Sequence, residues 1–191
     1  MSGRVDRAYF EELYANSGDP WDFETSAYER EKYRRTLGAL GDRRFGRAFE
    51  AGASIGVFTQ MLAGRCDELL AVDVSEKAVA AARERLGGLD HVRVERRTLP
   101  EEMPAGPFDL IVASEVLYYF PRSEMLAMLN GFEAALAPGG ALLAVHWRRE
   151  TRTYPLQGDE VHDLLAANTS LALKESVAEP DYRLDLFEDR A

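Results

Sequence analysis

Short apolar runs alternate with amphipathic stretches along most of the chain. The apolar runs predict strands at residues 47–50, 68–73, 91–96, 108–113 and 141–146. Apolar side chains at helical spacing predict helices at residues 56–63, 76–86 and 122–137. Pro138-Gly139-Gly140 is expected to end the last of these helices before the next strand begins. Strands that alternate with helices in this way predict an α/β fold with a parallel sheet.

The two ends of the chain depart from this alternation. Residues 1–44 are rich in charged and aromatic side chains, whose spacing predicts two helices joined by a turn at residues 17–20. At the other end, residues 171–178 and 182–188 predict an antiparallel hairpin. The chain has no internal repeat or linker, so we expect one domain over residues 1–191, with a helical cap at 1–44 and a core at 45–191.

Composition and charge narrow the function classes. A chain of 191 residues with 46% hydrophobic and 29% charged residues is typical of a soluble globular domain. Its formal charge of -10 repels phosphate backbones and anionic lipid heads. No apolar stretch approaches the roughly 20 residues that span a bilayer. We therefore expect a cytoplasmic protein, a monomer or homodimer, with no nucleic-acid or membrane partner.

The residues that ligate metals are sparse and badly spaced. Cys66 is the only cysteine, which excludes an internal disulfide and a multi-cysteine zinc site. His162 lies close to Asp159 and Asp163, but no second histidine stands at metal-ligand spacing. We expect no metal site, and we expect His162 to lie on a solvated helix face.

A glycine-rich turn is predicted where the first strand leads into a helix. Gly52 and Gly56 would let a nucleotide-like ligand approach the backbone near unpaired N–H groups. Their register differs from Gly-x-Gly-x-x-Gly, which disfavours a pyrophosphate site and hence a nicotinamide-dependent oxidoreductase. At the end of the next strand, the Asp73 carboxylate can accept both hydroxyls of a ribose. The alternative role for Asp73 is to cap the helix that begins near Ser75.

The sequence resembles the class I S-adenosylmethionine-dependent methyltransferases. Glu50, Gly52 and Gly56 match the first motif of that superfamily and Asp73 matches the second, and residues 106–112 and 136–140 resemble later motifs. Within the superfamily, residues 19–26, 28–30, 32–33 and 145–148 are most similar to NodS-like methyltransferases. The resemblance implies a Rossmann-like class I methyltransferase fold, with a mainly parallel sheet, a C-terminal antiparallel hairpin and an N-terminal helical cap.

The same resemblance implies S-adenosyl-L-methionine as cofactor, released as S-adenosyl-L-homocysteine. Arg30 is expected near the methionine carboxylate, with Trp21 or Tyr28 covering the pocket. Ser54 replaces the middle glycine of the first motif, and the Asp that often holds adenine is absent after the third strand, so adenine would contact Thr98, Leu99 and Val74. The predicted cofactor-binding residues are Trp21, Tyr28, Arg30, Glu50, Gly52, Ser54, Gly56, Asp73, Val74, Thr98, Leu99 and Ser114.

Methyl transfer from a sulfonium needs an aligned lone pair on the acceptor, so an amine acceptor must be unprotonated. Glu115, Tyr118 and Tyr119 follow the fourth strand and His146 ends the fifth, which makes them the candidate catalytic residues. Tyr118, Tyr119 and His146 could instead be packing residues. The resemblance favours transfer to a small-molecule amine, such as an amino sugar or a related metabolite. O-methylation, a nicotinamide-dependent oxidoreductase and a protein that binds without turnover are the alternatives.

Overall fold

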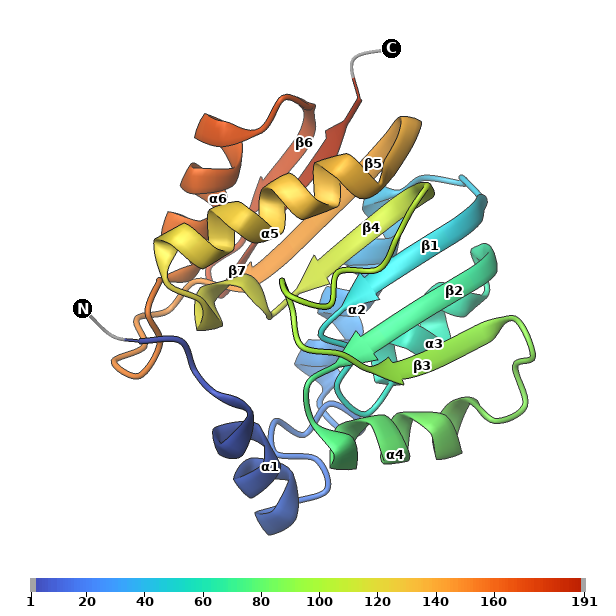
Figure 1. Cartoon of the computed structure of the whole chain (residues 1–191), viewed down its shortest axis with the longest axis vertical. Coiled ribbons are helices and arrows are strands. Elements are labelled where there is room, and N and C mark those ends of the chain that lie inside the picture. The colour runs from blue at the N-terminus through green and yellow to red at the C-terminus, as the bar shows by residue number, and fades with distance from the viewer. Residues whose placement is uncertain (1–2, 190–191) are drawn as a thin grey trace. The chain divides into compact units, whose positions relative to one another are not determined.

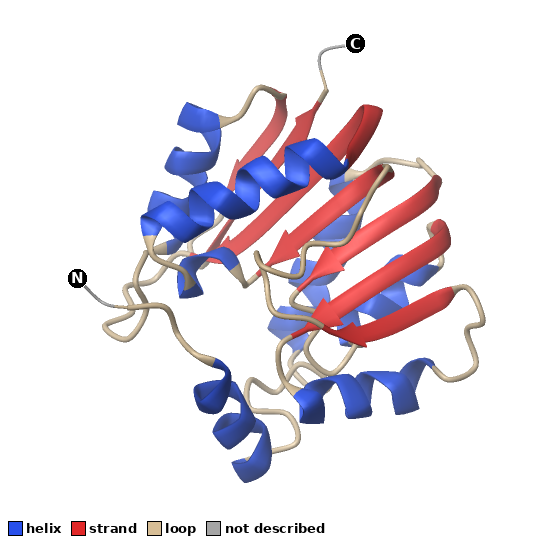
Figure 2. Ribbon diagram, in the orientation of Figure 1, coloured by secondary structure: helices blue, strands red, loops and turns tan. Residues whose placement is uncertain are grey.

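The computed structural model describes residues 3–189, and strands and helices alternate along them as the sequence predicts (Figures 1 and 2). The chain divides into two units, one made of residues 6–98 and the other of residues 99–189 together with 3–5. Each unit is described by itself below.

The unit of residues 6–98 has a parallel sheet in the order β3-β2-β1. Its strands are β1 (Phe45–Ala51), β2 (Cys66–Asp73) and β3 (Val92–Arg96). Its helices are α1 (Arg7–Asn16), α2 (Ala27–Ala39), α3 (Val57–Ala63) and α4 (Glu76–Leu86). Because the strands are parallel, Ala51, Asp73 and Arg96 end them at one edge of the sheet.

The helix starts follow from side-chain capping. The side chains of Asp6, Ser26 and Ser75 each accept a backbone N–H from the first turn of α1, α2 and α4 respectively. Both predicted N-terminal helices are therefore confirmed, and α4 has its predicted bounds.

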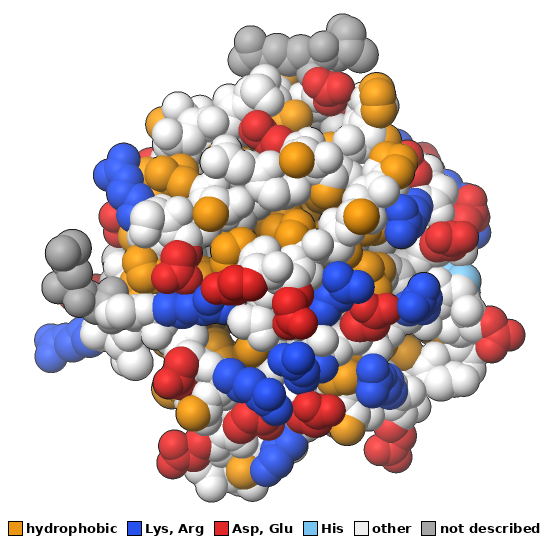
Figure 3. All heavy atoms as spheres, in the orientation of Figure 1, with side chains coloured by type: hydrophobic (Ala, Val, Ile, Leu, Met, Phe, Trp, Pro, Cys, Tyr) orange, Lys and Arg blue, Asp and Glu red, His pale blue; other side chains and the backbone are white. Residues whose placement is uncertain are grey.

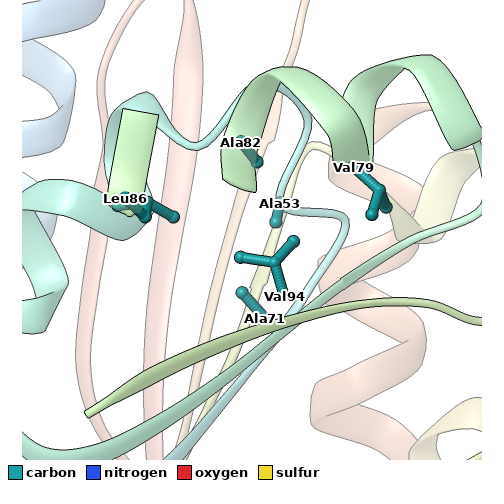
Figure 4. Close-up of a cluster of buried hydrophobic side chains, with 6 residues drawn as sticks. All are labelled: Ala53, Ala71, Val79, Ala82, Leu86 and Val94. Atoms are coloured by element: carbon teal, nitrogen blue, oxygen red, sulfur yellow. The ribbon is translucent and has the colours of Figure 1, made fainter. Parts of the chain in front are cut away.

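Helix α4 packs on β2 and β3 through a buried apolar cluster (Figure 4). The cluster consists of Ala53, Ala71, Val79, Ala82, Leu86 and Val94. Several of these side chains are alanines, which lets the backbones approach closely. The approach is tight at Gly56, where φ is +80° and a Cβ built on the residue would lie 3.1 Å from the Ala82 Cβ. The glycine at this end of the turn is thus required by packing.

The unit of residues 99–189 has strands in the order β4-β5-β7-β6. Strands β4 (Phe108–Ser114) and β5 (Leu136–Trp147) are parallel, and β7 (Tyr182–Glu188) runs antiparallel to both β5 and β6 (Ala172–Ala178). The predicted C-terminal hairpin is confirmed. A 3₁₀ turn, η1 (Leu117–Tyr119), and the helices α5 (Arg122–Ala135) and α6 (Gly158–Asn168) complete this unit.

Strand β5 begins at Leu136, earlier than the predicted start at residue 141. Phe108 pairs with Leu136, but Leu110 already pairs with Ala141, so the residues between them bulge out of the ladder. Pro138, Gly139 and Gly140, which were expected to precede the strand, lie within this bulge. Gly140 is confined within it, because a Cβ there would lie 2.8 Å from the Ala137 carbonyl oxygen.

Basic and acidic side chains are intermingled on the face shown in Figure 3. Within residues 3–189, no helix combines the length and the apolar character needed to cross a membrane. The same residues contain no cluster of three or more His, Cys, Asp or Glu side chains arranged to hold a metal ion.

Candidate functional site

The glycine turn leaves β1 in a left-handed backbone conformation. The φ angles of Gly52 and Gly56 are +80°, and that of Ser54 between them is +50°. The N–H groups of Gly52 and Ala53 both donate to the carbonyl of Val72 at 2.9 Å, which holds the turn against the end of β2. Alternating left-handed residues keep the turn narrow, so a ligand can reach its backbone.

Asp73 ties this turn to the start of α4. Its Oδ2 accepts the Ser54 N–H and its Oδ1 accepts the Ser75 N–H, both at 2.9 Å. Burial raises the pKa of Asp73 above its ordinary value, although these backbone hydrogen bonds oppose the shift. The N-cap of α4 is Ser75, not Asp73. Each carboxylate oxygen has a second acceptor position for a hydroxyl group.

Glu50 is a buried carboxylic acid at the end of β1. It is 2% exposed, and its Oε2 has no hydrogen-bond partner among the described residues. Burial raises its pKa to about 7, against an opposing contribution from the Thr59 hydroxyl, while the charge of Asp73 adds to the rise. A buried acceptor without a partner is costly, and a ligand that brings a cation or an N–H group would relieve that cost.

Helix α1 is fastened beside the same turn. The hydroxyl of Tyr14, which is 8% exposed, is hydrogen-bonded to the Ser54 hydroxyl at 2.6 Å. Glu11 accepts the Ser75 hydroxyl at 3.1 Å and the Glu76 N–H at 2.8 Å. Sequence reasoning missed both Tyr14 and Glu11 as site residues, because helical spacing marks the tyrosine as a packing residue and the glutamate as a surface charge.

Among the three residues expected to cover or hold the cofactor, Trp21 lies next to the turn. Its ring packs against the buried cluster of Tyr14 and Ile55. The ring of Tyr28 lies below the Lys32 ammonium group. Arg30 is exposed and donates to the Thr25 carbonyl at 2.9 Å. The cofactor contacts of these three residues stay predictions.

The remaining cofactor candidates are divided between the units. Val74 is partly exposed between Asp73 and Ser75, and the Thr98 hydroxyl accepts from the Arg96 guanidinium at 3.3 Å. Leu99 and Ser114 belong to the unit of residues 99–189. Their roles also stay predictions.

The turn after β4 places Glu115 in a left-handed conformation with φ +55°. Its N–H donates to the Val145 carbonyl at 2.8 Å. Its Oε2 accepts the Tyr118 hydroxyl at 2.6 Å and the Trp147 N–H at 2.9 Å. Strained, over-determined residues of this kind occur at functional sites. The structure thus brings the predicted pair of Glu115 and Tyr118 into direct contact.

Tyr118 and Tyr119 form an aromatic group with Tyr154. The rings of Tyr118 and Tyr154 are stacked with centroids 5.1 Å apart, and Tyr119 meets Tyr154 edge-on at 4.6 Å. Burial raises the pKa of Tyr118 and of Tyr119 well above the ordinary value, and the Glu115 carboxylate raises that of Tyr118 further, so both hydroxyls stay protonated. Sequence reasoning missed Tyr154, which lies in the loop after β5 without regular spacing.

His146 is fully buried, and both of its ring nitrogens are engaged within the protein. Its Nε2 accepts the Leu117 N–H at 3.2 Å, and its Nδ1 lies 3.1 Å from the His162 Nε2. The His162 Nδ1 in turn lies 2.8 Å from Asp185. The structure thus places a protein group against each ring nitrogen of His146, and its catalytic role stays a prediction. The prediction of a solvated His162 is wrong, because its side chain is 0% exposed.

A family model described as Nodulation protein S (NodS) matches residues 9–174. This chain belongs to the NodS family. Nodulation protein S of Bradyrhizobium diazoefficiens is 37% identical over 127 residues, which are 65% of this chain and 61% of that protein. Nodulation protein S of Rhizobium tropici is 32% identical over 127 residues, 65% of this chain and 53% of that protein. The matched part thus spans about three fifths or less of these NodS proteins.

The solved structures extend the likeness to the whole fold. The N-methyltransferase NodS from Bradyrhizobium japonicum WM9, in complex with S-adenosyl-L-homocysteine, has a TM-score of 0.86 and 28% sequence identity. That match covers 97% of this chain and 100% of the NodS chain. The predicted Rossmann-like class I methyltransferase fold and the resemblance to NodS-like proteins are therefore confirmed.

Proposed function

We propose that the chain is an S-adenosyl-L-methionine-dependent methyltransferase that methylates the nitrogen of a small-molecule amine. The observation that carries the proposal is the left-handed turn joined to Asp73, with the unpartnered buried oxygen of Glu50 beside it. The turn, the acceptor positions of Asp73 and the buried acid fit an adenosyl ligand that carries an ammonium group. The NodS structure with S-adenosyl-L-homocysteine supports this choice of ligand.

The cofactor would supply an activated methyl group on a sulfonium centre. Asp73 would hold the ribose hydroxyls through the acceptor positions left by Ser54 and Ser75. Glu50 would accept an N–H of the amino group, which restores a partner to its buried oxygen. Arg30 would pair with the methionine carboxylate, and Trp21 would cover the ligand. Most of the work of these residues is alignment and exclusion of water.

The acceptor would be oriented by Glu115. A carboxylate can accept an N–H from an amine and so hold the nitrogen with its lone pair free, or take its surplus proton. The hydroxyl of Tyr118 and the N–H of Trp147 fix the orientation of this carboxylate. The ring of Tyr154, which is stacked on the buried Tyr118 ring, is partly exposed and would offer a flat apolar face suited to a sugar or another ring.

The test of the cofactor is calorimetric titration of the purified protein with S-adenosyl-L-homocysteine and, separately, with NADH. We expect saturable binding of the first and none of the second. Tight binding of NADH without binding of S-adenosyl-L-homocysteine would overturn the proposal.

The test of the reaction is incubation with S-adenosyl-L-methionine and a panel of amines and alcohols, read by mass spectrometry of the methylated product. Glu115→Gln should lower kcat by about 100-fold or more while the affinity for S-adenosyl-L-homocysteine changes by less than about twofold. The exposed Glu175→Gln on β6 is the matched control and should leave both unchanged. A methyl group found on oxygen in every product would replace the amine with a hydroxyl acceptor.

A further inference from the structure

Three consecutive residues of β5 hold the turn that carries Glu115. The Val145 carbonyl accepts the Glu115 N–H, the His146 Nε2 accepts the Leu117 N–H, and the Trp147 N–H donates to the Glu115 carboxylate. Two of these contacts use the backbone of β5, and the third depends on one side chain. The position of the turn therefore depends on whether the His146 Nε2 is free of a proton and can accept the Leu117 N–H.

That ring is the first member of a buried row of hydrogen-bonded side chains that links three elements. The row runs from His146 on β5 to His162 on α6 and then to Asp185 on β7, and all three residues are 0% exposed. Beyond Asp185, the Ser176 hydroxyl donates to Oδ1 at 2.5 Å and the Arg183 guanidinium lies 3.1 Å from Oδ2. These three polar contacts of the carboxylate, with His162, Ser176 and Arg183, are thus all with donors or a cation.

The hydrogen bonds at the two ends of this row determine which ring nitrogen of each histidine carries the proton. A backbone N–H can only donate, so Nε2 of His146 has no proton, and a neutral His146 carries its proton on Nδ1. That proton points at Nε2 of His162, which must accept it. His162 then carries its proton on Nδ1 and donates it to the ionised Asp185. A second proton on either ring would place a donor against a donor.

Asp185 is ionised in this arrangement for a physical reason. Its oxygens accept hydrogen bonds from His162 and from the Ser176 hydroxyl and lie beside the Arg183 guanidinium, and these donors and this cation favour the ionised carboxylate.

We propose that Asp185 and His162 are positioning residues for methyl transfer: they fix the tautomer of His146, and through it the Leu117 N–H and the turn that carries Glu115. The inference rests on the proposed function for its effect on turnover, whereas the tautomers follow from the hydrogen bonds alone. Loss of the acceptor at residue 185 lets His162 carry its proton on Nε2. His146 must then move its proton to Nε2, which turns it against the Leu117 N–H.

The tautomers are measurable without any substrate. The chain has three histidines, and the third, His91, lies with its Nε2 at 3.1 Å from the Ala63 carbonyl, so its proton is on Nε2. Long-range ¹H–¹⁵N correlation spectra of the wild-type protein at about pH 8 should show two neutral rings with the proton on Nδ1 and one with the proton on Nε2. His91→Gln should remove the last signal. An Nε2–H tautomer or an imidazolium at either buried histidine would overturn the inference.

The consequence for turnover is tested with two variants of one residue. Asp185→Leu removes the acceptor, whereas Asp185→Asn keeps an oxygen that accepts the His162 proton. We expect Asp185→Leu to lower kcat/KM for the acceptor by about tenfold or more, because a small displacement of the Glu115 carboxylate is enough to slow the reaction by this much. The affinity for S-adenosyl-L-homocysteine should change by less than about twofold. Asp185→Asn should recover most of the loss. Equal losses in both variants, or a parallel loss of cofactor affinity, would reduce Asp185 to a structural role and overturn the inference.

Hydrogen exchange separates the remaining outcomes. If Asp185→Leu fails to fold, the Leu117 amide in the folded Asp185→Asn variant should exchange as slowly as in the wild type, and fast exchange in the wild type itself would contradict the inference. If the wild-type protein methylates no amine, the proposed function fails. The tautomers and the exchange rate of the Leu117 amide still test whether Asp185 and His162 fix the His146 tautomer.

Discussion

Glu50 gives the chain a pH dependence that one substitution should remove. Its carboxyl is buried, and its pKa rises from 4.5 to about 7 on folding. Below about pH 4.5 both the folded and the unfolded chain carry the proton; above that pH the unfolded chain loses it while the folded chain keeps it. The unfolded state is then favoured increasingly until the folded state also ionises, near pH 7. The Glu50 contribution to stability therefore falls as the pH rises through this window.

The magnitude follows from the size of the shift. At about 1.4 kcal/mol per pKa unit, a rise from 4.5 to about 7 costs about 3 kcal/mol of unfolding free energy once Glu50 is ionised in both states. Glu50→Gln has nearly the same shape and stays neutral. We expect the variant to match the wild type within about 1 kcal/mol at about pH 4.5 and to be more stable by about 3 kcal/mol at about pH 8.5.

The assay is urea unfolding followed by circular dichroism at both pH values, with S-adenosyl-L-methionine absent. The exposed Glu68→Gln on β2 is the control, and the difference between it and the wild type should change little with pH. If Glu50→Gln shifts the unfolding free energy by the same amount at both pH values, Glu50 does not change its protonation across this range and the reasoning is refuted.

Three further predictions concern the turn. A double-mutant cycle of Ser54→Ala and Tyr14→Phe should give a coupling free energy of about 1 kcal/mol in urea unfolding, since each hydroxyl is the partner of the other; additive effects would contradict this contact. Gly56→Ala should lower the unfolding free energy by about 2 to 4 kcal/mol, because the added Cβ meets Ala82 at φ +80°; a neutral effect in thermal unfolding would contradict it. Asp73→Ala should weaken S-adenosyl-L-homocysteine binding by at least about tenfold in calorimetry, and unchanged affinity would remove Asp73 from the site.

The order of strands and helices was predictable because it depends on local signals. Apolar runs and capping residues fix β2, α4 and β7 to within a few residues of their predicted bounds. The start of β5 was not predictable in this way. Its first residue, Leu136, pairs with Phe108 across a bulge, and such pairing is a long-range property that a Pro-Gly-Gly signal conceals.

The geometry of the candidate site was predictable where neighbouring residues in the sequence determine it. The turn from Gly52 to Gly56 and the strand-end Asp73 are of this kind. His162 is not, because its burial depends on contacts with β5 and β7, and its two acidic neighbours in sequence suggested a solvated face. Tyr14 likewise shows its role only when α1 meets Ser54.

The left-handed backbone at Glu115 has a consequence for attempts to improve the protein. Glycine or asparagine would adopt a φ of +55° more readily than glutamate, by about 1 kcal/mol. A library selected for thermostability would therefore tend to replace Glu115 and lose the carboxylate that is proposed to orient the substrate amine. Screens at this position need an activity readout as well as the melting temperature.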